Sequence, residues 1–289
     1  MSASPSAASR IAVIGSNGQL GTDLMKVLAG RDVVGLTHSD VDITQLGSVK
    51  GVLDGLRPQM VINTAAYNRV DECELHPDTG FLVNAVGPFN LAAVCRSLGA
   101  VLVHFSSDYV FDGSKAEPYS ETDCPSPING YGISKLAGEH FVRYSLDRYF
   151  IIRTSGLYGK AGSRSKGGNF VEAMLKLGME RRAIRVVNDQ TLSPTYTLDL
   201  ANKVHELVFT TAFGLYHVTS AGSCTWHDFA KKVFELSGIA VDLTATTSEE
   251  YGSTARRPRF SVLQNRRLQV IGLGSLRPWE EALRAYLAE

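Results

Sequence analysis

Tyr131 and Lys135 lie four residues apart in the segment YGISK. On a helix this spacing places both side chains on one face, one turn apart. A phenol titrates near pH ~10 in water, and an ammonium group beside it lowers that pKa by stabilising the phenolate. With a serine hydroxyl to hold a substrate carbonyl and a hydride donor nearby, the tyrosine could protonate the carbonyl oxygen. The pair therefore suits carbonyl reduction, although Tyr-x-x-x-Lys also occurs by chance on amphipathic helices.

A glycine-rich turn near the start of the chain offers a place for that hydride donor. A short β-branched strand over residues 10–14 leads into Gly15, Gly18 and Gly21, and helical spacing follows over residues 22–28. Residues without Cβ allow backbone N–H groups and a helix N-terminus to approach a pyrophosphate. The G-x-x-G-x-x-G spacing differs from G-x-G-x-x-G, and a tight turn without a ligand is the alternative. The strand–turn–helix order favours dinucleotide binding.

The rest of the chain repeats this alternation of strand and helix. We predict strands over residues 32–36, 60–67, 101–105 and 150–153, helices between them, and a loop over residues 112–129. This order, with no internal repeat, predicts an α/β fold with a doubly wound, Rossmann-type parallel sheet. Ser107 and Asp108 follow one of the strands, at the sheet edge where ligands bind in open α/β sheets. His104 lies within that strand and is expected in the core.

The character of the chain changes after residue 157, where shorter and mixed elements begin. We divide the chain into a disordered tail (1–9), an NAD(P)-binding domain (10–156) and a smaller mixed α/β substrate-binding lobe (157–289), which is interleaved with late elements of the main sheet. The elements expected there are a loop over 158–168, a strand over 184–187, and helices over 169–178, 195–209, 226–237 and 278–287. Trp226 and Trp279 are expected to pack in the lobe core.

The overall composition excludes several classes of protein. The 289 residues are 44% hydrophobic and 20% charged, and 29 basic residues balance 29 acidic ones. A net charge of zero provides no attraction of the whole molecule to nucleic acid or to an anionic membrane. No apolar stretch approaches the ~20 residues of a membrane span, and the N-terminus does not read as a signal peptide. We therefore expect a cytoplasmic protein.

Cysteines and local charge clusters narrow the candidate sites. The cysteines are widely spaced, which predicts reduced thiols rather than disulfides or a zinc site, and no His/Cys/carboxylate cluster suggests a catalytic metal. They are Cys73, Cys95, Cys124 and Cys224. Asp71 and Glu72 are expected to be solvated helix charges. The pairs Arg181-Arg182 and Arg256-Arg257 could bind a phosphate, and an exposed ion pair is the alternative for the second.

The acidic residues after the second strand bear on the choice of cofactor. An acidic side chain at that strand end binds ribose hydroxyls and selects NAD, whereas a basic one favours NADP. Asp40 and Asp42 lie near the required position, but Asp42 could instead cap the helix after Thr44. NADH and NADPH both stay open.

Taken in order, these motifs make the chain resemble the extended short-chain dehydrogenase/reductases, and more closely the dTDP-4-dehydrorhamnose reductase family. The resemblance extends over residues 11–287. The matching segments are 15–21, 42–44, 63–67, 70–71, residue 84, 105–113, 131–135, 153–155, 169–171, 189–190, 193–195 and 255–258.

The resemblance implies reduction of the 4-keto group of a nucleotide-linked 6-deoxy sugar by NADPH or NADH, giving dTDP-L-rhamnose from dTDP-4-dehydro-L-rhamnose. Ser107 would hydrogen-bond the keto oxygen, Tyr131 would protonate it, and Lys135 would hold the nicotinamide ribose and lower the pKa of Tyr131. The implied cofactor-binding residues are Gly15, Asn17, Gly18, Gln19, Leu20, Asp42, Ile43, Thr64, Ala65, Ala66, Tyr67, Asn84, Tyr131 and Lys135. The implied substrate-binding residues are Ser107, Asp108, Tyr131, Gly156 and Asn169.

Two positions depart from the family pattern. Ser107 stands where the family usually has Thr, and this change keeps the hydroxyl. Gly156 stands where the family commonly has a Trp packed on the sugar. We therefore expect either a larger sugar pocket or one closed by the loop through residue 168.

Other functions on the same fold stay open. A 4,6-dehydratase would need an acid–base pair, typically Asp-Glu, and Tyr109 stands where that glutamate would follow Asp108. A nucleotide-sugar epimerase would use the same Tyr and Lys. A regulatory subunit of methionine adenosyltransferase shares the fold and much of the cofactor site without being an enzyme. A homodimer stays open beside a monomer.

Overall fold

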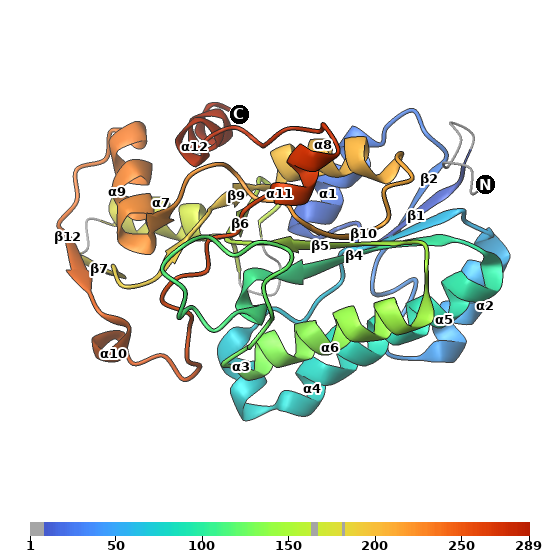
Figure 1. Ribbon diagram of the computed structural model, residues 1–289. Helices are drawn as coiled ribbons and strands as arrows, with labels where there is room; N and C mark the ends of the chain where they lie inside the picture. The colour runs from blue at the N-terminus through green and yellow to red at the C-terminus, as the bar shows by residue number, and fades with distance from the viewer. Residues whose placement is uncertain (1–8, 163–166, 181–182) are drawn as a thin grey trace.

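A six-stranded, all-parallel sheet forms the centre of the protein in a computed structural model that describes residues 9–162, 167–180 and 183–289. The strand order is β10-β5-β4-β3-β1-β2, so the predicted doubly wound sheet is confirmed (Figure 1). The strands are β1 (Ile11–Ile14), β2 (Val33–Leu36), β3 (Met60–Asn63), β4 (Val101–Ser107), β5 (Tyr149–Thr154) and β10 (Gly214–His217). Most of the predicted tail, the Arg181-Arg182 pair and part of the loop over 158–168 lie outside the described residues.

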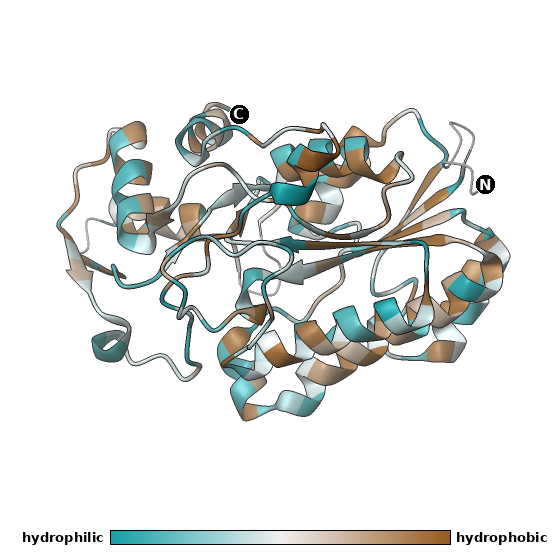
Figure 2. Cartoon of the chain, in the orientation of Figure 1, coloured by the Kyte–Doolittle hydropathy of each residue, from teal (hydrophilic) through white to brown (hydrophobic). Residues whose placement is uncertain are grey.

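Helices cover both faces of this sheet (Figure 1). On one face lie α2 (Leu46–Leu56), α5 (Gly87–Leu98) and α6 (Gly130–Ser145), and on the other α1 (Gln19–Val27), α8 (Thr197–Val208) and α11 (Arg266–Val270). Because both faces are covered, the central strands are continuous apolar runs rather than alternating ones, and Figure 2 shows them as hydrophobic bands. The carboxyl ends of β1, β3 and β4 are therefore held rigidly side by side.

One helical stretch contradicts the expectation that no segment is long and apolar enough to span a membrane. Residues Pro77–Leu98 satisfy that test by length and composition, as a continuous run of α4 (Pro77–Phe81), the π-helix η1 (Leu82–Val86) and α5. Half of its apolar window is buried inside the protein, where α5 packs against α2, α6 and β4. Its hydrophobicity is explained by this packing in the helical layer.

The second lobe lies at the carboxyl edge of the sheet and has its own core. Its longer helices are α7 (Phe170–Met179), α9 (Trp226–Ser237) and α12 (Trp279–Ala288), and its short strand pairs are β7 (Ile184–Val187) with β12 (Leu243–Thr246), β8 (Thr191–Leu192) with β11 (Cys224–Thr225), and β6 (Leu157–Tyr158) with β9 (Thr195–Tyr196). Single-turn pieces are α3 (Val70–Leu75), η2 (Asp108–Val110) and α10 (Ser248–Tyr251). Trp279 is buried and Trp226 packs against the same cluster, which confirms both as lobe-core residues.

Several elements differ from their predicted bounds. The helix expected over 195–209 is β9 followed by α8, because Thr195 and Tyr196 pair with β6 before the helix begins. Strand β10 and helix α11 follow residue 157 but pack on the main sheet. Both elements are four or five residues long, too short for hydrophobic periodicity to identify.

Candidate active site

The turn between β1 and α1 has no room for side chains at two of its glycines. Gly15 has φ +77°, and a Cβ there would lie 2.7 Å from Thr64 Oγ1. A Cβ on Gly21 would lie 2.1 Å from the carbonyl oxygen of Gly15. Gly18 caps α1 without a side-chain hydrogen bond, so N–H groups of the first turn keep their capacity for an anion. The buried Gln19 Oε1 also has no partner among the described residues. The turn fits a dinucleotide pyrophosphate.

The other predicted cofactor residues of the sheet edge surround this turn. Thr64 Oγ1 donates to the carbonyl of Ile14 at 2.8 Å, which joins the ends of β3 and β1. Asn84 is buried, and its amide bonds both the N–H and the carbonyl of Tyr67 at 2.9 Å. Asn84 also donates to Ser134 Oγ at 3.0 Å. Its role in the structure is to fasten the loop after β3 to helix α6.

The acidic residues after β2, for which the sequence left two roles open, each bind a nearby threonine. Asp42 accepts hydrogen bonds from the N–H and hydroxyl of Thr44, which lower the pKa of its carboxyl. It does not cap α2, whose N-cap is Gln45. Asp40 is likewise bound by the N–H and hydroxyl of Thr37. The side chain of Ile43 is buried in the hydrophobic core on one face of the sheet. In each aspartate a threonine binds one carboxylate oxygen, Oδ2 of Asp40 and Oδ1 of Asp42, so these contacts do not decide between NAD and NADP.

Tyr131 lies in the first turn of α6, beside Ser107 at the end of β4. The helix begins there because Asn129 Oδ1 accepts from the N–H of Gly132 at 2.7 Å. Burial raises the pKa of Tyr131, and a hydrogen bond with the Ser107 side chain opposes this rise. The expected lowering of the Tyr131 pKa by Lys135 is therefore not observed, because burial outweighs every favourable contact. At neutral pH Tyr131 is a neutral phenol, which is the form that donates a proton.

Lys135 is buried one turn after Tyr131, with 2% of its surface exposed. Its Nζ donates to the carbonyl of Phe105 in β4 at 2.6 Å. Burial lowers the pKa of Lys135 to about 8, and the carboxylate of Glu139 opposes this effect. His104, whose pKa is lowered by burial and by Lys135, is buried in β4 as predicted.

Asp108 is the polar centre of the site. Its Oδ1 accepts from Ser107 Oγ at 2.9 Å, and its Oδ2 accepts from Ser155 Oγ at 2.7 Å and from Ser261 Oγ at 2.6 Å. Burial raises the pKa of the Asp108 carboxyl against these three hydrogen bonds. Sequence reasoning missed Ser261, which lies 153 residues from Asp108 and carries no motif that would have identified it.

Two of the predicted substrate-binding residues, Gly156 and Asn169, also have structural roles. Gly156 has φ +55°, and a Cβ there would lie 2.7 Å from Leu192 Cδ1. A Cβ at residue 156 would also lie 3.2 Å from Pro194 Cα, so the lobe packs closely against this glycine. Asn169 caps α7: its Oδ1 accepts from the N–H of Glu172, and its Nδ2 donates to the carbonyl of Gly159. Its amide is consumed by these bonds.

A cavity of about 420 Å³ opens next to the site and is lined by Arg256, Arg257 and Arg259. The segment 256–261, which carries these arginines, contacts the site at both ends. Asn129 Nδ2 donates to the carbonyl of Arg256 at 2.8 Å, and Ser261 Oγ donates to Asp108. Other wall residues are Ser114, Gln190 and Ser248. Two carboxylates, Asp112 and Glu249, also line the cavity, so the three arginines give it only a small excess of positive charge, which suits an anionic ligand.

The arginines differ in what they contact. Arg257 forms an ion pair with Asp71 at 2.6 Å, and its side chain is 19% exposed. Asp71 is therefore a partner of the lobe rather than the solvated charge expected from the sequence. The side chains of Arg256 and Arg259 form no hydrogen bond or ion pair with the part of the chain that the structure describes, and both residues are exposed on the cavity wall. They can turn toward an anion.

Comparisons with known proteins identify relatives over the whole length of the chain. The family model described as the RmlD substrate binding domain matches residues 9–289. The chain is 42% identical to the dTDP-4-keto-6-deoxy-D-glucose reductase of Streptomyces niveus, covering 94% of each, and 39% identical to the dTDP-4-dehydrorhamnose reductase of Streptomyces griseus, covering 97% of this chain and 93% of the relative. The crystal structure of dTDP-4-dehydrorhamnose reductase from Bacillus anthracis in complex with NADP superposes with a TM-score of 0.93, at 41% identity, covering 97% of this chain and 99% of that one.

Proposed function

The chain belongs to the dTDP-4-dehydrorhamnose reductase family, and we propose that it reduces the 4-keto group of a dTDP-linked 6-deoxy sugar with NADPH. The observation that carries this proposal is the grouping of Ser107, Tyr131 and Lys135 at the carboxyl end of β4, in a fold whose glycine turn has no room for side chains at Gly15 and Gly21. A regulatory role would not need a neutral phenol hydrogen-bonded to a serine hydroxyl.

Each of the three residues has a defined task in the proposed reaction. Ser107 and Tyr131 hydrogen-bond the keto oxygen, and Tyr131 transfers its proton to that oxygen as the carbonyl becomes an alcohol. Lys135, charged below about pH 8, provides positive charge beside the phenolate that remains. The nicotinamide, when bound, supplies the hydride. The carbonyl of Phe105 fixes the position of the ammonium group.

Several residues are proposed to hold the cofactor. Gly15, Gly18 and the first turn of α1 would bind the pyrophosphate, and the loop from Thr64 to Tyr67 would cover it. Asn17, Gln19, Ala65, Ala66 and Lys135 complete the proposed set. NADPH is proposed over NADH because the Bacillus anthracis relative was crystallised with NADP.

The cavity beside the arginines is the proposed seat of the nucleotide part of the substrate. Arg256 and Arg259 would pair with its diphosphate, while Asp108 and Ser107 face the sugar. In this arrangement residues 10–156 with β10 and α8 bind the cofactor, and the lobe binds the nucleotide. We expect the enzyme to act in the cytoplasm.

Two sugars are candidates. dTDP-4-dehydro-L-rhamnose is proposed first, because several relatives are named as reductases of that compound. dTDP-4-keto-6-deoxy-D-glucose is the second candidate, because a 42% identical relative is named for it.

The test is the loss of nicotinamide absorbance at fixed enzyme concentration. Each of the two keto sugars is offered with NADPH and with NADH, and the product is identified by NMR. We expect oxidation of NADPH with at least one sugar and slower oxidation of NADH. Cofactor binding without turnover of either sugar would contradict the reductase proposal.

A further inference from the structure

Glu139 forms the centre of a buried polar network behind the reacting groups. Its Oε1 accepts from Ser106 Oγ at 2.6 Å and from Arg153 Nε at 2.8 Å, and its Oε2 accepts from Arg153 Nη2 at 2.7 Å. Both charged side chains are 1–2% exposed. Burying two charges costs several kcal/mol per ion before their attraction is counted, so apolar side chains of similar volume could stabilise the core at least as well. It calls for an explanation beyond stability.

The network joins the two elements that carry the chemistry. Glu139 follows Lys135 by one helical turn on α6, whereas Ser106 lies between Phe105 and Ser107 on β4. The hydrogen bond from Ser106 to Glu139 therefore fixes the position of the end of β4 along helix α6. The same strand end supplies the Phe105 carbonyl that holds Lys135 and the Ser107 hydroxyl that meets Tyr131. A shift of this strand end would separate both contacts at once.

The carboxylate of Glu139 also acts on the charge of Lys135. Among the groups around Lys135, His104 on β4 is held neutral by burial, Tyr131 is a neutral phenol, and Arg153 on β5 is paired with Glu139. The negative charge of Glu139 raises the pKa of Lys135 against desolvation. Without it, Lys135 would lose its proton at lower pH.

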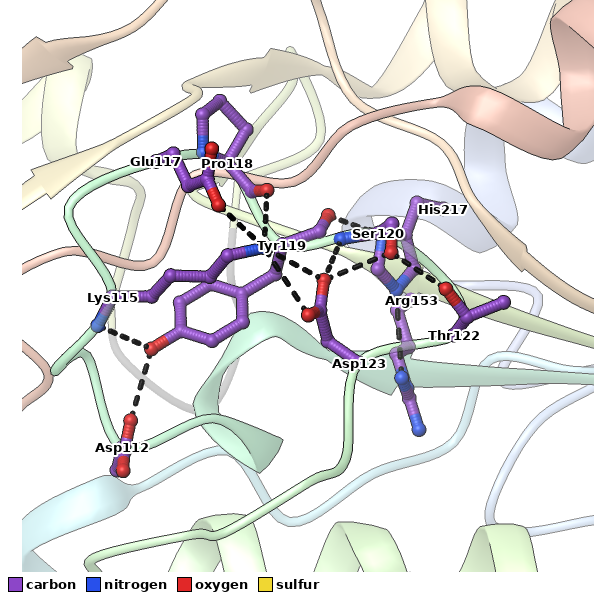
Figure 3. Close-up of polar contacts among 10 residues, drawn as sticks. All are labelled: Asp112, Lys115, Glu117, Pro118, Tyr119, Ser120, Thr122, Asp123, Arg153 and His217. Atoms are coloured by element: carbon purple, nitrogen blue, oxygen red, sulfur yellow. Dashed lines mark hydrogen bonds and ion pairs between the residues drawn. The ribbon is translucent and has the colours of Figure 1, made fainter.

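The network reaches the loop that precedes α6. Arg153 Nη1 lies 3.5 Å from His217 Nε2, and His217 Nδ1 lies 3.1 Å from the carbonyl of Tyr119 (Figure 3). Burial and Arg153 lower the pKa of His217 to about 3, so the ring is neutral. Since Arg153 can only donate, the ring accepts at Nε2 and donates from Nδ1 to Tyr119. The loop over 112–129 is thereby joined to the Glu139–Arg153 ion pair. An ion pair between Lys115 and Asp123 stabilises this loop internally.

We propose that Glu139 is a positioning residue for this reaction: through Ser106 and Arg153 it holds the end of β4 in register with α6, so that Ser107, Tyr131 and Lys135 meet one substrate oxygen and Lys135 keeps its charge. This inference rests on the proposed reductase function. It assigns the buried ion pair to catalysis through geometry and charge, with no contact of Glu139 with substrate.

The test separates geometry from charge with two variants. Ser106→Ala removes only the hydroxyl bridge, and we expect kcat to fall about tenfold because the strand end loosens, with the alkaline limb of the pH–rate profile unchanged. Glu139→Gln combined with Arg153→Gln removes both charges without leaving one unpaired. In this variant we expect a lower kcat and an alkaline limb that moves to lower pH by about half to one unit. The matched control is Asp199→Asn with Arg277→Gln, which removes a bidentate ion pair between α8 and the segment before α12.

Several outcomes would overturn the proposal. One is a folded Glu139/Arg153 double variant with wild-type kcat and an unmoved alkaline limb. If that variant does not fold, unchanged kcat in Ser106→Ala does the same. An equal shift of the limb in the Asp199/Arg277 control would show a nonspecific effect and also overturn it. If the wild type turns over neither sugar, the reductase proposal fails separately. The role of Glu139 is then tested by the pH at which NADPH affinity falls to half. The double variant must lower this pH, and an unchanged value refutes the role of Glu139.

Discussion

Ser107 donates a hydrogen bond at 2.9 Å to the carboxylate of Asp108, its neighbour in the chain. The other oxygen of that carboxylate accepts from Ser155 at the end of β5 and from Ser261 in the lobe segment after the arginines. One buried carboxylate therefore orients the hydroxyl proposed to hold the keto oxygen and also joins the sheet to the lobe. The position of Ser107 depends on contacts made far away in the sequence.

Replacing Asp108 with Ala should impair both folding and activity. Three buried hydroxyls lose their acceptor, which should lower the free energy of unfolding by about 1–3 kcal/mol. Misplacement of Ser107 should lower kcat by about tenfold or more. Ser261→Ala breaks one of the three contacts and should give a smaller loss, whereas Ser97→Ala, which removes a hydroxyl bonded only to the Val94 carbonyl, should leave kcat unchanged. Urea unfolding and steady-state kinetics measure both effects, and wild-type kcat in Asp108→Ala would refute the orienting role.

Tyr131→Phe should abolish turnover while the cofactor still binds. Removing a proton donor costs about 10²–10⁴-fold in rate, and the ring itself is retained. Tyr144→Phe on the same helix is the matched control, because Tyr144 is 82% exposed and points away from the site. NADPH affinity, followed by fluorescence, should change less than about twofold in either variant. A Tyr131→Phe enzyme that keeps a substantial fraction of kcat would require another acid.

The titration of Lys135 should limit activity at alkaline pH. With a pKa of about 8, the ammonium group is lost above that pH, and kcat should fall there. The sign for stability is opposite: the folded pKa lies below the unfolded value near ~10.4, so the unfolded chain binds more protons between these pH values and stability rises with pH.

Lys135→Met should therefore be inactive but more stable at pH 7, by about 1–2 kcal/mol, because no charge is desolvated. The gain should vanish toward pH ~10.5. Lys50→Met, which removes an exposed lysine of α2, should change stability by less than about 0.5 kcal/mol. Thermal unfolding across pH measures the difference, and a destabilised Lys135→Met at pH 7 would show that the bond to Phe105 outweighs the buried charge.

Local patterns in the sequence predicted the sheet and the reacting pair, because each depends on spacing within one element. The glycine turn, the strand at 101–105 and the helix with Tyr131 and Lys135 are of this kind. The elements that could not be predicted depend on distant partners. Nothing near Asp108 indicates Ser261, and nothing near Gly156 indicates that Leu192 packs against it. Burial, which raises the pKa of Tyr131, is likewise a property of the whole fold and cannot be read from the Tyr-x-x-x-Lys spacing.

Gly21→Ala tests the glycine turn. The added Cβ would lie 2.1 Å from the Gly15 carbonyl, so the start of α1 must shift, at a cost of about 1–3 kcal/mol in stability and at least tenfold in NADPH affinity. Gly51→Ala is the control, since a Cβ there meets no atom within 4 Å on α2. It should raise stability by about 0.5–1 kcal/mol. Equal effects of the two substitutions on NADPH affinity would exclude the turn as the pyrophosphate site.

Arg256 and Arg259 should carry the affinity for the nucleotide part of the substrate. A hydrogen bond to a charged group contributes about 1.5–3 kcal/mol, so replacing either residue with Ala should raise KM for the dTDP sugar about tenfold or more, with kcat and the KM for NADPH nearly unchanged. Added salt should raise KM in the wild type and have a weaker effect in the Arg256→Ala/Arg259→Ala enzyme.

Arg257 provides the contrast within the same segment. Its guanidinium is paired with Asp71, so Arg257→Ala should act mainly on stability, by leaving that carboxylate without its partner. Arg96→Ala, at the exposed end of α5, should change neither the free energy of unfolding nor the KM for the dTDP sugar, and it is the control for loss of positive charge. If Arg257→Ala alone raised KM for the dTDP sugar while Arg256→Ala and Arg259→Ala did not, the diphosphate would have to displace Asp71. Substrate binding would then open the contact between α3 and the lobe.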